Sequence, residues 1–108
     1  MSTPDYPIFA NSTQYQPVAA SQNNAALGPG GGGVGDYLSH LTVIPATTSP
    51  GPVTVSDGAT QPTVFTGGAN SVSSLVPFTI ALGAKSTSGG WKITTGAGVS
   101  VVAFGQFS

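Results

Sequence analysis

Few residues in this chain could do acid–base or nucleophilic chemistry. Asp36 and His40 could in principle join one of the many serines in a catalytic triad. Their segment is typical of a β-strand, in which two residues at this spacing share a face but lie about 13 Å apart. We therefore predict that His40 is a packed or surface residue of a strand and that the pair is not catalytic.

The other candidate sites fail for similar reasons. The three aspartates fall in a predicted tail, linker or turn, so they do not supply the paired carboxylates of glycoside hydrolysis. Gly28, Gly30 and Gly33 match G-x-G-x-x-G, but no strand precedes them and no helix follows, as dinucleotide binding requires. The chain contains no cysteine, which excludes disulfides and thiolate metal sites. We expect that the protein is not an enzyme and that it has no catalytic, cofactor-binding or metal-binding residues.

Charge is scarce throughout the sequence. Charged residues make up 5% of the chain, against roughly 25% in ordinary globular proteins. Two lysines are too few to neutralise the phosphates that a nucleic-acid binder contacts. No apolar run approaches the roughly 20 residues of a membrane span. We expect neither nucleic acid nor membrane as a partner, and we favour a surface covered largely by other chains over a polar, solvated one.

The elements that would position any site begin with a predicted extended N-terminal arm, residues 1–27. Its three prolines favour extended backbone, and no regular period runs through it. Aromatic residues are unusual in a purely disordered tail, which is the alternative interpretation. We expect the arm to lie along a partner, anchored by Tyr6, Ile8, Phe9 and Tyr15.

Residues 28–35, with the sequence GPGGGGVG, predict a flexible linker. Glycine accepts positive φ without steric cost, and glycine-rich segments are flexible. We expect this stretch to let the arm and the body dock in separate directions. The predicted hinge residues are Gly30, Gly31, Gly32 and Gly33.

Residues 36–108 predict an all-β body, a small antiparallel β-sandwich or barrel. Short runs of aliphatic, aromatic and β-branched residues alternate with turns rich in Gly, Pro, Ser and Asp. We predict Trp91, Phe104 and Phe107 as core or interface anchors; the alternative for Trp91 is stacking on a sugar. The expected strands are residues 36–44, 53–55, 62–65, 71–82, 91–95 and 99–107.

The predicted body is small for an independent domain. A domain of this size buries only about 60% of the surface that its unfolded chain exposes. Without disulfides or a metal, self-association is the remaining means of stabilisation. We expect a homo-oligomer, with a homotrimer as the favoured state.

Three phrases of the body carry a family resemblance: GDYLSHLTVIPATTSPGPVTVSDG, SLVPFTIALG and GWKITTGAGVSVVAFGQF. They are similar to small Gly/Ser/Thr-rich structural proteins of tailed-phage virions, of the head-decoration or capsid-cement type. The resemblance covers roughly residues 35–108. It rests on the general Gly/Ser/Thr-rich character of the sequence and on the shorter phrases PATTSPG and TTGAGVSV. It implies a non-enzymatic protein on the capsid surface that binds the major capsid protein. The alternative is a carbohydrate- or receptor-binding module of a tail fibre or head fibre.

Overall fold

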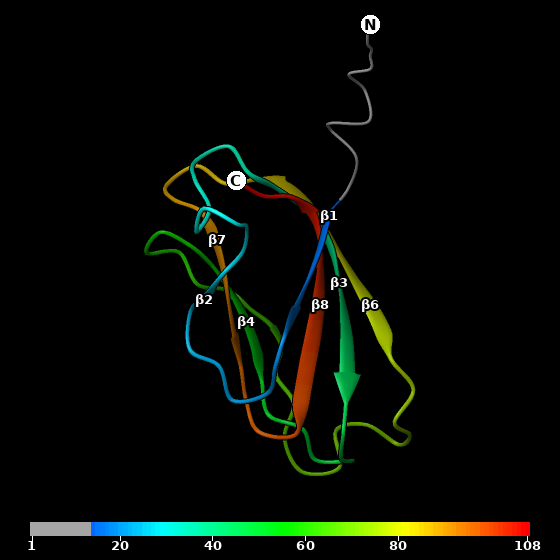
Figure 1. The fold of residues 1–108 in the computed structure, drawn as a ribbon. Helices are drawn as coiled ribbons and strands as arrows, with labels where there is room; N and C mark the ends of the chain where they lie inside the picture. The colour runs from blue at the N-terminus through cyan, green and yellow to red at the C-terminus, as the bar shows by residue number, and fades with distance from the viewer. Residues whose placement is uncertain (1–13) are drawn as a thin grey trace, which may run out of the picture.

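The computed structural model describes residues 14–108, and every regular element in this range is a β-strand. The strands form two antiparallel four-stranded sheets that pack face to face as a sandwich (Figure 1). The predicted all-β sandwich is therefore confirmed. The predicted arm anchors Tyr6, Ile8 and Phe9 lie outside the described residues.

The two sheets have different strand orders. The first sheet has the order β1-β8-β3-β6, and the second has the order β2-β7-β4-β5. The first sheet consists of β1 (Gln14–Val18), β8 (Val99–Gln106), β3 (Tyr37–Pro45) and β6 (Phe78–Lys85). The second sheet consists of β2 (Ala25–Ala26), β7 (Trp91–Thr95), β4 (Val53–Asp57) and β5 (Thr63–Phe65).

The core lies between the sheets and follows the strand alternation. On β8, Val99, Val101 and Ala103 are buried, while the residues between them are partly exposed. Because successive strand residues point to opposite faces of a sheet, every second side chain of a strand points into the core. The core also contains Leu41 and Val43 from β3, and Val53, Val55 and Ile93 from the second sheet.

Residues 14–27 differ from the predicted separate arm, because they contribute an edge strand to each sheet. Strand β1 pairs with β8 and β2 pairs with β7, while Val18 and Leu27 are buried in the core. Pro17 is tolerated because an edge strand need not donate on both sides. The sandwich therefore includes residues 14–27 of the arm that the sequence predicts.

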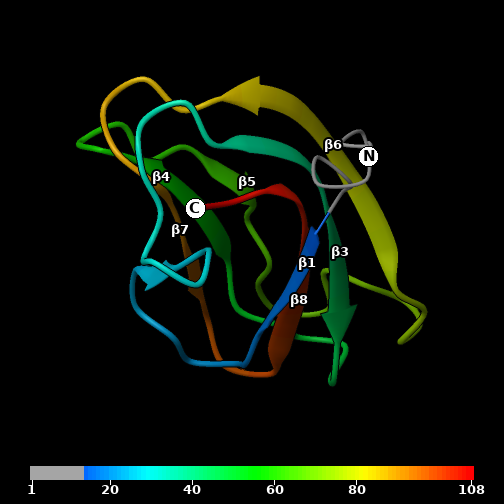
Figure 2. The ribbon, with the colours of Figure 1, turned by 45° about the horizontal axis from the view of Figure 1, so that its top comes forward.

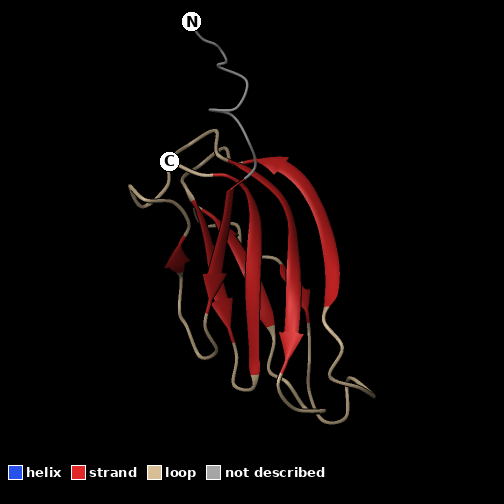
Figure 3. Cartoon of the chain, turned by 45° about the vertical axis from the view of Figure 1, so that its right-hand side comes forward, coloured by secondary structure: helices blue, strands red, loops and turns tan. Residues whose placement is uncertain are grey.

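The glycine-rich stretch also differs from a free linker. Gly30 N–H donates to the Ser108 carbonyl at 2.7 Å. A Cβ on Gly90 would lie 2.7 Å from the Cα of Gly32, so these two backbones touch directly. Figure 3 shows the loops gathered at the two ends of the sandwich, and this stretch lies at the end that holds Ser108. Gly30 and Gly32 therefore pack against the sandwich, whereas a Cβ on Gly31 would meet no atom within 4 Å.

Strand β6 is the predicted strand whose start differs most from expectation. The sequence predicts a strand over 71–82, but β6 begins at Phe78, directly after Pro77. Residues 71–77 form a loop, and the strand then runs on to Lys85. Proline lacks the N–H that a sheet ladder uses, so the break falls at Pro77.

Candidate functional site

Asp36 holds several loops together through its side chain. Its side chain is buried, and its Oδ2 atom accepts hydrogen bonds from the N–H groups of Gly33 and Ser108, both at 3.0 Å. Its Oδ1 atom accepts a bond from the Ser108 hydroxyl at 2.9 Å. The carboxylate is therefore occupied by backbone and hydroxyl donors, and it ties residues 72 positions apart in the sequence.

The indole of Trp91 belongs to the same end of the molecule. Trp91 is only 7% exposed, and its Nε1–H donates to the Asp36 carbonyl at 2.9 Å. Phe107 is buried beside this region in the same core cluster. Trp91 therefore cannot offer its ring to a sugar in this structure, and the carbohydrate interpretation loses the residue on which it was based.

Several loops meet around Asp36 and form what we call the loop junction, residues 28–36, 86–91 and 107–108. Ser86 is buried there; its hydroxyl donates to the Gly33 carbonyl and its N–H donates to the Asp36 carbonyl. Gly35 N–H donates back to Ser86. The junction is therefore held by polar contacts inside the chain.

Asp57 lies beside the junction and caps the turn after β6. Its carboxylate accepts hydrogen bonds from the N–H groups of Thr87 and Ser88 at 2.9–3.1 Å and from the Thr87 hydroxyl at 3.0 Å. These bonds, that from Ser88 N–H first, lower the pKa of Asp57 below its ordinary value. The aspartate therefore orders a turn as an anion.

The outer face of the first sheet carries an aromatic row made of Tyr15, Phe104 and His40. The register places Tyr15 on β1 and His40 on β3 on either side of Phe104 on β8. His40 stacks on Phe104 with ring centroids 4.5 Å apart, and Tyr15 lies 6.4 Å from Phe104 on the other side. Tyr15 is 69% exposed. Three rings from three strands thus form one accessible surface.

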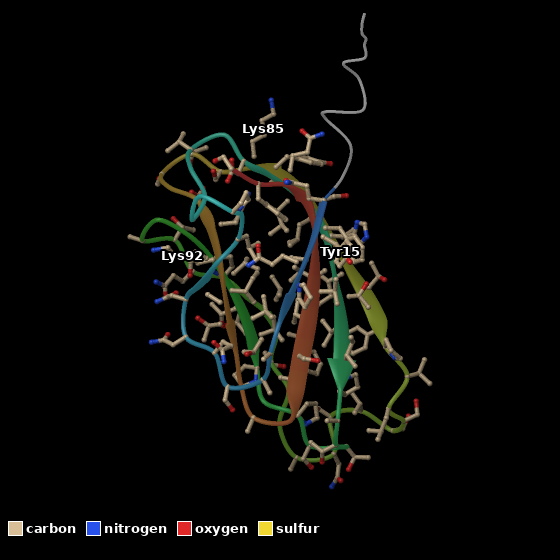
Figure 4. The ribbon with its side chains drawn as sticks, in the orientation of Figure 1. Tyr15, Lys85 and Lys92 are labelled. Atoms are coloured by element: carbon tan, nitrogen blue, oxygen red, sulfur yellow. The ribbon has the colours of Figure 1, made fainter. Side chains whose placement is uncertain are left out.

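Within the part of the chain that the structure describes, the strand positions around the aromatic row contain no Asp, Glu, Lys or Arg. They are the residues that alternate with the buried ones on the same strands, and all are exposed or partly exposed. Figure 4 shows Lys85 at one end of the sandwich and Lys92 beside β7, both apart from Tyr15. The surrounding positions are Pro17, Val102, Thr42, Ile44, Thr79 and Ala81.

The outer face of the second sheet has a different chemistry. Thr54 on β4 and Thr63 on β5 have hydroxyl oxygens 3.3 Å apart. Asn24 precedes β2, and its amide oxygen accepts bonds from the hydroxyls of Ser56 and Thr94. This face is covered by short polar side chains that bond to one another, and Lys92 projects from it.

The fold brings some of the predicted site residues together and separates others. Tyr15 and Phe104 come together in the aromatic row, although they were predicted as an arm anchor and as a core or interface anchor. Trp91 and Phe107 lie in the core. His40 was predicted only as a packed or surface residue, and its place in the row depends on the register of β3 with β8. The alternation of β8 was the sequence signal available for Phe104.

The described residues contain no group of three or more His, Asp or other metal-binding side chains that could hold an ion. Within residues 14–108, no helix is long and apolar enough to cross a membrane. Comparisons of the chain with protein-family models, with curated proteins and with solved structures found no match.

Proposed function

We propose that this chain is a non-enzymatic structural protein of a virion, of the capsid-decoration or cement type. In this proposal it self-associates, binds the major capsid protein at the capsid surface, and stabilises contacts between neighbouring capsid subunits. The observation that supports it best is the uncharged outer face of the first sheet, with its aromatic row of Tyr15, Phe104 and His40.

The composition of this face fits a protein partner. Aromatic residues are enriched and charged residues are depleted at the centres of protein interfaces. The row supplies the rings, and Val102 and Ile44 supply further partly exposed apolar surface. Contiguous apolar patches on a small protein mark sites of interaction.

The sandwich also holds the row in a fixed arrangement. Phe104 and His40 lie on β8 and β3, the two central strands of the first sheet, and they stack on each other. Side chains that are already ordered lose less conformational entropy on binding than mobile ones. The row is therefore suited to bind a partner with a small loss of side-chain conformational entropy.

The test is the retention of purified protein on virions, measured by co-sedimentation. We expect Tyr15→Ser to reduce binding by about tenfold or more, the effect of losing one central aromatic contact. Because Tyr15 lies on an edge strand and is largely exposed, the thermal midpoint should fall by only a few degrees. Lys92→Ser on the outer face of the second sheet is the matched control, and it should bind normally.

Two outcomes would contradict the proposal. If Tyr15→Ser and Lys92→Ser variants bind virions equally well, the aromatic row is not the contact surface. If the wild-type protein binds neutral glycans on an array and loses that binding on Tyr15→Ser, the row is a carbohydrate-binding platform instead.

A further inference from the structure

Among residues 14–108, strand β6 presents the longest strand edge without a pairing strand. The four edge strands are β1 and β6 in the first sheet and β2 and β5 in the second. Strand β6 has eight residues, whereas β2 has two, β5 has three and β1 has five with Pro17 among them. Figure 2 shows β6 at the outer margin of the first sheet. Its outward backbone groups are therefore available to another strand.

The features that usually protect an edge strand are weak in β6. Natural proteins block exposed edges with charged side chains, prolines, bulges or very short strands. In β6 the charge lies at the last residue, Lys85, and the proline lies before the strand. The register shift against β3 leaves Leu82 and Gly83 opposite a single β3 residue, so the bulge of β6 lies toward that same end, where Gly83 has φ of 62°. The stretch Phe78–Leu82 is left without a charge, a proline or a glycine.

Apolar side chains gather along the same edge. Phe78, Ile80 and Leu82 turn toward the core but are only partly buried. Phe78 packs edge-on against Phe65 of the second sheet, with centroids 5.3 Å apart. Just before the strand, Leu75 is 50% exposed and Val76 is 67% exposed. A strand added beside β6 would cover apolar surface that the single chain leaves in water.

We propose that β6 pairs with β6 of a second copy of this chain. The two strands run antiparallel about a two-fold axis at Ile80, so two four-stranded sheets become one continuous sheet across the dimer. The inference deepens the self-association in the proposed function and rests on it for biological meaning. The dimer itself does not depend on binding to a particle.

The alternation of β6 selects this register. Residues directly opposite in an antiparallel pair point to the same side, so the core-facing residues of one copy must oppose the core-facing residues of the other. With Ile80 opposite Ile80, Phe78 opposes Leu82 and Thr79 opposes Ala81. This register overlaps the whole of Phe78–Leu82 with itself.

Charge and symmetry agree with a second copy as the occupant. The stretch Phe78–Leu82 carries no charge that a copy would repel, and the antiparallel arrangement places the two Lys85 residues at opposite ends of the paired strands. A two-fold contact of identical surfaces closes on itself. This edge therefore specifies a dimer, in place of the trimer expected from the sequence.

The test combines sedimentation with charge substitutions at Thr79 and Ala81, which are exposed and face outward. The wild-type protein should sediment as a dimer at micromolar concentration. The Thr79→Lys/Ala81→Lys variant places like charges opposite each other twice, which should weaken dimerisation about tenfold or more. The Thr79→Lys/Ala81→Glu variant places opposite charges across the pair and should remain a dimer.

A control variant separates edge pairing from a general effect of charge. Ala59→Lys/Gln61→Lys has the same spacing and the same added charge, at exposed positions between β4 and β5, and should remain dimeric. Each variant is also tested by circular dichroism, so that loss of the fold is not mistaken for dissociation. Hydrogen exchange of β6 amides in the wild-type protein gives a second readout, with slower exchange at high protein concentration.

A wild-type monomer at these concentrations, or a Thr79→Lys/Ala81→Lys variant that dimerises like the wild type, would overturn the inference. A Thr79→Lys/Ala81→Glu variant that dissociates as fully as the Lys/Lys variant would overturn the register. If the dimer is right but the proposed contact with the particle is wrong, the β6 variants behave as expected, but Tyr15→Ser does not change retention on virions.

Discussion

The loop junction and the outer face of the first sheet use the side chains of this sequence in opposite ways. At the junction, Asp36 and Ser86 are buried, and their polar atoms bond within the chain. On the outer face, the rings of Tyr15 and Phe104 touch each other and solvent. The scarce carboxylates thus stabilise loops, while the uncharged sheet surface carries accessible aromatic rings. Substitutions at the junction should therefore reduce stability, and substitutions in the row should reduce binding.

The largest effect on stability is expected from Asp36→Ala. The substitution leaves the partly buried hydrogen bonds from Gly33 and Ser108 without their acceptor. Hydrogen bonds to a charged group contribute about 1.5–3 kcal/mol each, so a total loss of about 3 kcal/mol is expected. The thermal midpoint should fall by roughly 10–20 °C. Asp36→Asn keeps one acceptor oxygen and should lose less.

Virion binding by the folded fraction of Asp36→Ala distinguishes the two regions. If the junction only stabilises the sandwich, this fraction binds like the wild type at a temperature where the variant is folded. A variant that keeps its thermal midpoint but loses binding would show that the junction itself belongs to the contact surface.

The body was easier to predict from sequence than the elements before it. Strand β7 matches its predicted bounds, because Trp91 and Ile93 alternate with Lys92 and Thr94 between glycine turns. Strand β1 was missed because its core-side residue Gln16 is polar. That side chain donates to the Ala26 carbonyl and accepts from Gly28 N–H, contacts that no local pattern indicates.

The candidate site was harder to predict, because it depends on register. Tyr15, Phe104 and His40 come from three strands far apart in sequence, and the shift in β3 between Leu38 and His40 decides which residue faces Phe104. A slip of one residue would move each side chain to the other face of the sheet. Composition indicated an uncharged surface, but only the pairing of the strands shows where its rings gather.

An intermediate effect is expected where the glycine-rich stretch packs against the sandwich. Gly32 has φ of +83°, and a Cβ there would lie 3.0 Å from both the Cα of Gly90 and the Leu27 carbonyl oxygen. Gly31 has φ of +84°, but a Cβ there would meet no atom within 4 Å. Gly31→Ala is therefore the matched control, with a strain cost of about 1 kcal/mol. Gly32→Ala should lower stability further, because it also disturbs the packing.

The contrast between these two variants also tests the predicted hinge. In a hinge, both substitutions would impair assembly and leave the thermal midpoint of the body nearly unchanged. In the packed arrangement, Gly32→Ala lowers the midpoint more than Gly31→Ala, and virion binding by both folded variants stays normal. Equal midpoints for the two variants would contradict the packing of Gly32 against Gly90.

The smallest effect concerns Asp57, whose carboxylate orders the turn beside the junction. Because hydrogen bonds from Ser88 and Thr87 lower its pKa in the folded state, the folded protein favours the anion more than the unfolded chain does. This stabilisation is complete above the unfolded pKa, and it is lost as the pH falls through the lower folded value.

Between about pH 5 and pH 3, the thermal midpoint of the wild type should fall more steeply than that of Asp57→Asn, which lacks this titration. The two proteins differ only at residue 57, so the difference between the two curves isolates Asp57. At neutral pH the two proteins should bind virions equally, since Asp57 belongs to the second sheet and the aromatic row to the first. Parallel midpoint curves would show that the bonds from Thr87 and Ser88 do not favour the anion, and unequal binding at neutral pH would extend the contact surface toward the junction.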